Sequence, residues 1–185
     1  MAEQLIYQRL HQCNNALPKN RDDLEIKNVK GKGKGIFTTK PIKKGSLITL
    51  YPVHIIIKYN NNKDDEYAVA DKLYDEDEYN NIDKLKHCVD YFLKVTDEFF
   101  IMGDPEHIAN QDLIGHLCND KGYHPMKCYR PNLNNCCIHN LAIYALRNIS
   151  AGEELCVAYG KEYWYSSKNG DSHHEKILRS LKNCV

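Results

Sequence analysis

The first clear pattern of apolar positions runs from residue 24 to residue 59, where β-branched and aromatic residues are mixed with polar ones. Glycines interrupt this run at positions 31, 33 and 35, and the segment 41–45 (PIKKG) interrupts it again. Short β-branched and aromatic runs are typical of strands, whereas glycine and proline are typical of turns. The pattern therefore predicts strands joined by tight turns, and not parallel strands joined by helices.

The next segment, 60–81, is polar and acidic around one weakly alternating stretch, which predicts an exposed insertion with one strand inside it. Residues 87–102 return to strand-like content. Residues 108–118 have the composition of one or two helical turns that end before Asn119. Two further apolar runs, 138–149 and 154–159, lie on either side of a turn with the sequence SAGEE.

Apolar residues on helical spacing also occur near the two ends, for example Leu5, Ile6 and Leu10 at the start. We therefore expect a helical extension over 1–23, one mainly β domain over 24–164 that carries the acidic insertion at about 60–81, and a helical segment over 165–185.

Composition narrows the class of protein. The chain has 185 residues, and its 25 basic residues balance 25 acidic ones, so the broad basic surface of a nucleic-acid-binding protein is not expected. Eight cysteines are too few for a disulfide scaffold, and the first residues lack an apolar secretion signal. The longest strongly apolar runs, such as 53–57, are far shorter than a membrane span. We expect an intracellular protein that neither crosses a membrane nor binds nucleic acid directly.

Three separated segments carry the candidate chemistry: KGKGIFTTKPIKKGSLI at 32–48, LIGHLCND at 113–120, and RNISAGEELCVAYGKEYW at 147–164. Together, and in this order, they resemble the SET-domain lysine methyltransferases. The resemblance runs from about residue 30 to residue 164. It implies a SET fold of small curved sheets, in which the C-terminal segment threads beneath a preceding loop.

The first segment is similar to the family's glycine-x-glycine opening, here Gly33, Lys34 and Gly35. Paired glycines allow a ligand to approach the backbone closely, because no Cβ stands in the way. The spacing lacks the third glycine of a dinucleotide-binding fingerprint and leads into a strand. The resemblance therefore implies that these three residues bind S-adenosyl-L-methionine through their backbone.

The second segment matches the family's asparagine-histidine motif when Asn119 takes the place of the asparagine, which implies a contact with the cofactor. In this register Asp120 stands where the family has histidine, and it is assigned to the cofactor site as well. A rival register would align His116 with the family histidine and leave Gly115 at the asparagine position. We prefer the first register, although it also places His116 where the family has arginine.

The third segment matches the family's Gly-Glu-Glu-Leu and Tyr-Gly elements, and Tyr159 falls on the catalytic tyrosine. Trp164 falls where the family often has an aromatic residue beside the cofactor. Tyr51 matches an aromatic residue of the lysine channel, and we assign it to catalysis with Tyr159. Val157 occupies a channel position that commonly tunes how many methyl groups are added, but the number of methyl groups stays open.

The resemblance implies a protein-lysine N-methyltransferase that uses S-adenosyl-L-methionine, with a histone tail as the expected substrate and the nucleus or cytosol as its location. The acidic insertion would attract such a basic tail. The abundant lysine, asparagine, isoleucine and tyrosine are associated with an AT-rich genome, such as that of a protist or a large virus, and for a virus the location would be a host cell. Two alternatives stay open, namely an inactive SET-like interaction module and a methyltransferase of a non-histone protein. The oligomeric state is not predicted.

No metal site is expected. Many histone-directed members carry a zinc-binding cysteine cluster after the core, but after Trp164 this chain has only Cys184. A second group of possible ligands, Cys128, Cys136, Cys137 and His139, does not have the spacing of a common structural zinc site.

Overall fold

The computed structural model describes residues 4, 8, 22–60, 66–72, 88–96, 99–108, 111–122, 129–160 and 163. Except for residues 4 and 8, which are helical, the expected N-terminal helix lies outside the described residues, and so does the expected C-terminal helical segment. The chain forms two compact units, Met1–Tyr51 with Ile108–Lys161, and Pro52–His107 with Glu162–Val185.

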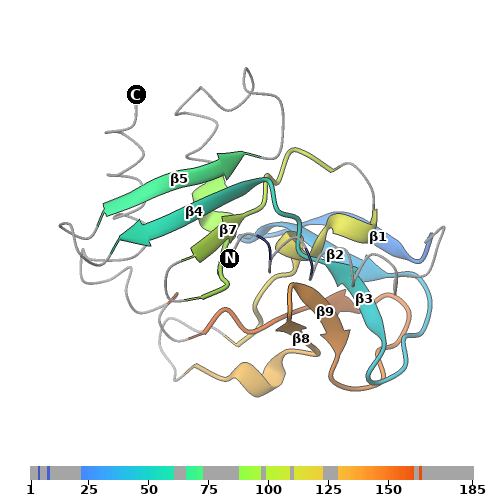
Figure 1. Ribbon diagram of the computed structural model, residues 1–185. Coiled ribbons are helices and arrows are strands. Elements are labelled where there is room, and N and C mark those ends of the chain that lie inside the picture. Colours follow the sequence, from blue (N-terminus) through green and yellow to red (C-terminus); the bar gives the residue numbers. More distant parts are fainter. Residues whose placement is uncertain are drawn as a thin grey trace. The chain divides into compact units, whose positions relative to one another are not determined.

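The first unit contains two antiparallel sheets (Figure 1). The first sheet has the order β1 (Leu24–Val29), β2 (Gly33–Thr38), β10 (Glu154–Leu155). The second has the order β3 (Leu47–Leu50), β9 (Ala142–Ala145), β8 (Cys136–His139). Three 3-10 turns complete the described elements of this unit: η2 (Gln111–Leu113), η3 (Gly115–Leu117) and η4 (Pro131–Leu133).

The second unit is built on one antiparallel sheet with the order β5, β4, β7, β6. These strands are β4 (Ile55–Asn60), β5 (Glu66–Lys72), β6 (Phe92–Lys94) and β7 (Phe99–Met102), and the 3-10 turn η1 (Val89–Tyr91) precedes β6. β4 and β5 are antiparallel neighbours in this sheet (Figure 1). β5 is the strand expected inside the acidic insertion, and residues 73–81 of that insertion lie outside the described residues.

The described part of the chain is therefore mainly β, as the apolar pattern predicts. One predicted run is divided, because residues 138–149 contain the turn between β8 and β9. Asn140 and Leu141 make this turn with φ values of 51° and 65°, which is the left-handed geometry of a two-residue hairpin. This turn is not predicted from the sequence, because leucine is an unusual residue at a positive φ. The helical composition of 108–118 becomes two 3-10 turns.

Each unit has its own apolar core. In the first unit, Ile36 of β2, Ile48 and Leu50 of β3, Ile143 of β9 and Leu155 of β10 are fully buried. In the second unit the largest fully buried side chains come from the two central strands: Ile55, Ile56, Ile57, Ile101 and Met102. Burial of these strand residues provides the main driving force for forming the sheets.

β3 holds the segment that leads to Asn119. The buried hydroxyl group of Thr49 donates to the carbonyl oxygen of Asp112 at 2.9 Å and accepts from the backbone N–H of Ile114 at 3.2 Å. Gly115 packs so closely that a Cβ there would lie 2.8 Å from the carbonyl oxygen of Leu50. Only glycine fits at position 115, and the segment 111–118 is therefore fixed against β3.

Candidate functional site

Asn119 lies where two distant segments of the first unit meet. It forms an isolated parallel bridge with Cys156, and its carbonyl oxygen accepts from the backbone N–H of Val157 at 2.9 Å. Its side chain is 6% exposed. The second and third sequence motifs are thus joined through their backbones at this residue.

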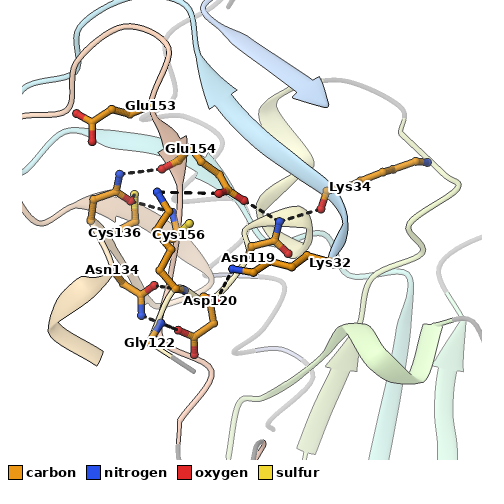
Figure 2. Close-up of polar contacts among 12 residues, drawn as sticks. Lys32, Lys34, Asn119, Asp120, Gly122, Asn134, Cys136, Glu153, Glu154 and Cys156 are labelled. Carbon is orange, nitrogen blue, oxygen red and sulfur yellow. Dashed lines mark hydrogen bonds and ion pairs between the residues drawn. The ribbon is translucent and has the colours of Figure 1, made fainter. Parts of the chain in front are cut away.

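The amide group of Asn119 has a defined orientation. Its Nδ2 donates to the backbone carbonyl oxygen of Lys34 at 3.1 Å and to Oε1 of Glu154 at 2.8 Å (Figure 2). An amide nitrogen has two protons, so both are used by protein acceptors. The carbonyl oxygen Oδ1 accepts no hydrogen bond from the described residues, and it is the atom left for a ligand.

Glu154 was not identified from the sequence as a site residue, although it belongs to the Gly-Glu-Glu-Leu element. Its second oxygen, Oε2, lies 3.9 Å from Nζ of Lys121. The carboxylate group therefore has a cation on one side and the Asn119 amide on the other. An acidic residue in a strand gives no sign of this role until the chain is folded.

The two glycines of the first motif, Gly33 and Gly35, are each required for a different structural reason. At Gly35 a Cβ would lie 2.7 Å from Nδ2 of Asn119 and 2.9 Å from Oε1 of Glu154, so a side chain would displace this pair. At Gly33 no atom lies within 4 Å of such a Cβ, but φ is +76°, which favours glycine. Gly35 is therefore required by packing against Asn119, whereas Gly33 is required by the backbone.

Tyr159 lies beside the segment that contains Asn119. Its hydroxyl group donates to the carbonyl oxygen of Cys118 at 2.8 Å, and its backbone N–H donates to Oδ2 of Asp120 at 2.9 Å. The side chain is half-buried. The structure therefore brings Tyr159 into contact with the two residues that flank Asn119.

Asp120 is buried, with 3% exposure, and its carboxylate group accepts from protein donors. Oδ1 accepts from the backbone N–H of Gly122 at 2.6 Å and from Nδ2 of Asn134 at 2.8 Å, and Oδ2 accepts from the hydroxyl group of Tyr129 at 2.8 Å. Nζ of Lys32 donates to the backbone carbonyl oxygen of Asp120 at 2.8 Å (Figure 2). Lys32, Tyr129 and Asn134 are not predicted from the sequence as site residues, because nothing in their local sequence relates them to Asp120.

Two of the other predicted site residues are also in the first unit. Tyr51 is buried, its backbone N–H donates to the carbonyl oxygen of Leu141 at 2.7 Å, and its ring meets that of His116 edge-on at 6.2 Å between centroids. Val157 is buried, with 1% exposure. Trp164 lies outside the described residues.

Three buried cysteines of the first unit, Cys118, Cys136 and Cys156, are free thiols. Burial raises the pKa of Cys136 and of Cys156 to about 12, and it raises the pKa of Cys118 as well. A protonated thiol is a poor nucleophile and a poor metal ligand. In the described ranges no group of three histidine, cysteine or acidic side chains is arranged for a metal ion, and Cys128 and Cys184 lie outside those ranges.

Comparison with known families gives one match that spans most of the chain, to the SET domain, over residues 33–160. A curated relative, the histone-lysine N-methyltransferase specific for histone H3 lysine 37 of Schizosaccharomyces pombe, is 24% identical over 152 residues. That alignment covers 82% of this chain and 83% of the relative.

Among solved structures, a Plasmodium falciparum protein described as a candidate histone methyltransferase is 16% identical, with a TM-score of 0.40. The comparison covers 78% of this chain and 99% of that one. None of the helices among the described residues has the length and apolar character needed to cross a membrane.

Proposed function

The chain belongs to the SET domain family, and from this premise we propose that it is a protein-lysine N-methyltransferase that takes its methyl group from S-adenosyl-L-methionine. The observation that carries the proposal is the convergence of Asn119 and Tyr159, which are 40 positions apart in the sequence. The Tyr159 hydroxyl group donates a hydrogen bond to the carbonyl oxygen of Cys118, the residue that immediately precedes Asn119. These are the residues that match the family's cofactor-contacting asparagine and catalytic tyrosine.

The donor and acceptor set around Asn119 fits this cofactor. Oδ1 of Asn119 is available to accept from an amino group, and S-adenosyl-L-methionine has amino groups at its amino-acid end and on its adenine. The backbone at Gly33 has no side chain, and a Cβ there would meet only open space. Asn119 with Gly33, Lys34 and Gly35 would hold the cofactor, which supplies a methyl group activated by a positively charged sulfur.

The chain's own residues would do the rest by positioning and by excluding water. Methyl transfer needs the amine, the methyl carbon and the leaving sulfur nearly in line, so a fixed geometry lowers the barrier. The lysine must be neutral to have a lone pair, and apolar walls such as the buried Tyr51 and Val157 would favour this by desolvation. The oxygen of Tyr159, held by the Cys118 carbonyl group, can accept weak C–H···O contacts from the methyl group.

A histone tail is the proposed substrate, because the curated relative is named for histone H3 lysine 37, and the nucleus is then the proposed location. Tritium-labelled S-adenosyl-L-methionine, incubated with the protein and either core histones or a cell extract depleted of histones, would test this. We expect label on histone H3. Label only on other proteins would favour a non-histone substrate, and cofactor binding without any transfer would favour an inactive module. The Tyr159→Phe variant, tested in parallel, controls for a contaminating methyltransferase.

A further inference from the structure

The backbone around Tyr159 is held by side chains, because the sheet ends before it reaches this residue. β10 ends at Leu155, and the bridge between Asn119 and Cys156 follows it. Beyond this bridge the N–H of Tyr159 donates to Oδ2 of Asp120, and the N–H of Gly160 donates to the hydroxyl oxygen of Tyr129 at 3.1 Å. Two consecutive amide groups therefore depend on acceptors in the side chains of Asp120 and Tyr129.

The Asp120 carboxylate group is suited to hold a backbone rigidly. Its two oxygens accept from the N–H of Gly122, Nδ2 of Asn134, the hydroxyl group of Tyr129 and the N–H of Tyr159, all between 2.6 and 2.9 Å. A carboxylate has about four acceptor positions, so these donors occupy them. Burial of this charge is tolerable because every position has a donor, and the charged acceptor makes each bond stronger than a neutral one.

Tyr129 connects the Asp120 carboxylate group to Gly160, the residue after Tyr159. Its hydroxyl group donates to Asp120 and accepts from the N–H of Gly160, so one oxygen joins the two. Burial, together with the hydrogen bond to Asp120, raises the pKa of Tyr129 to about 12, so the group keeps its proton. Asn134 also holds the Asp120 carboxylate group in place, because it donates to Asp120 and accepts from the N–H of Lys121 at 2.8 Å.

We infer that Asp120 and Tyr129 are positioning residues, which set the place of the Tyr159 hydroxyl group by holding the backbone N–H groups of Tyr159 and Gly160. This inference rests on the proposed function. It gives Asp120 a role other than the cofactor contact expected from its place in the motif. A small rotation of the backbone at residue 159 moves the distant phenol oxygen further, and displacements of about 1 Å can lower a rate about 100-fold.

The test compares Tyr129→Phe and Asp120→Asn with wild-type protein and with Tyr144→Phe. The first variant removes one hydroxyl group and keeps the ring. The matched control removes a hydroxyl group from β9, where Tyr144 packs against the core cluster of Leu50 and Ala142. The measurements are kcat and KM for methyl transfer, the dissociation constant of the cofactor by calorimetry, and hydrogen exchange of the amides of residues 159 and 160.

We expect kcat to fall about tenfold in Tyr129→Phe and further in Asp120→Asn, because precise placement of the reacting groups carries most of the catalysis. The cofactor dissociation constant should stay within about twofold, and exchange of the Gly160 amide should speed up, since its acceptor is lost. Asp120→Asn is also expected to speed up hydrogen exchange of the Tyr159 amide. The control Tyr144→Phe should match wild type in kcat and in exchange at residues 159 and 160.

The outcomes separate the inference from the proposed function. If the wild-type protein is active and Tyr129→Phe and Asp120→Asn both keep its kcat, the inference is overturned and the proposed function stands. The same holds if weaker cofactor binding accounts for the whole loss of rate in these variants. Unchanged exchange at residues 159 and 160 would overturn it too, with or without activity. An inactive wild-type protein would overturn the proposed function and, with it, the positioning role inferred for Asp120 and Tyr129.

Discussion

The hydroxyl group of Tyr159 donates a hydrogen bond to the carbonyl oxygen of Cys118 over 2.8 Å. This bond joins two segments that are 41 positions apart and fixes the phenol oxygen beside the residue that precedes Asn119. A catalytic tyrosine needs such a fixed oxygen, because a freely rotating side chain would lose much of the benefit of positioning.

Tyr159→Phe should lower kcat by about 100-fold, the size of effect seen when one preorganised polar group is removed from an active site. The stability should fall by only about 1 kcal/mol, since one half-buried hydrogen bond is lost. Methyl-transfer kinetics and thermal unfolding measure the two effects. Wild-type turnover in this variant would remove the catalytic role proposed for the hydroxyl group.

Asn119→Ala should weaken cofactor binding by at least about tenfold, which corresponds to about 1.4 kcal/mol. The substitution removes the Oδ1 acceptor and also removes the two hydrogen bonds that Nδ2 donates to the Lys34 carbonyl group and to Glu154. The free energy of unfolding should therefore decrease by about 1–3 kcal/mol. Calorimetry with S-adenosyl-L-methionine is the measurement, and Asn28→Ala, at an exposed position in β1, is the control. Equal affinities in the two variants would contradict the assignment.

Gly35→Ala should also weaken cofactor binding, because its Cβ would push against Nδ2 of Asn119 and Oε1 of Glu154. Overpacking of this kind costs about 1–3 kcal/mol of stability. Gly45→Ala is a matched control, since its φ of +81° makes alanine unfavourable by about 1–2 kcal/mol while its Cβ would meet open space. The two variants should thus lose comparable stability, but only Gly35→Ala should lose affinity for the cofactor.

The second unit should become less stable as the pH falls below neutrality. Burial lowers the pKa of His54 from 6.5 to about 4, His107 adds to this shift, and Asp104 opposes it. In the folded protein Nδ1 of His54 accepts from the backbone N–H of Asp104 at 2.6 Å, which requires the neutral ring. Because the pKa is lower in the folded state, the stabilisation is complete above about pH 6.5 and is lost as the pH falls through about 4.

The variant His54→Asn tests this pH dependence, because its side-chain oxygen can accept a hydrogen bond and does not titrate. Its unfolding temperature should change less between pH 7 and pH 4.5 than that of wild type. His139→Asn, at an exposed position in β8, should keep the wild-type pH dependence. Parallel pH profiles for wild type and His54→Asn would show that His54 does not carry the effect.

Much of the fold and part of the site follow from linear patterns. The β-branched runs predict β1 to β4, β6 and β7, because the preference for a half-buried strand is a local property. The turn at Asn140 and Leu141 is not predicted from the sequence, because it lacks glycine and its geometry results from the pairing of β8 with β9. Among the candidate site residues, Gly33, Gly35, Asn119 and Tyr159 stand in compact motifs that the sequence shows directly.

The sequence by itself thus determined the strand-rich class of the fold and the residue types that match the family's chemistry. Only the tertiary structure decided how those residues are held, with Glu154 orienting Asn119, and Asp120 and Tyr129 holding the backbone of Tyr159. The physical reason is that a buried polar group takes whichever partner the folded chain presents within about 3 Å. For Asp120 those partners lie 2, 9, 14 and 39 positions away, and no local pattern encodes such a set.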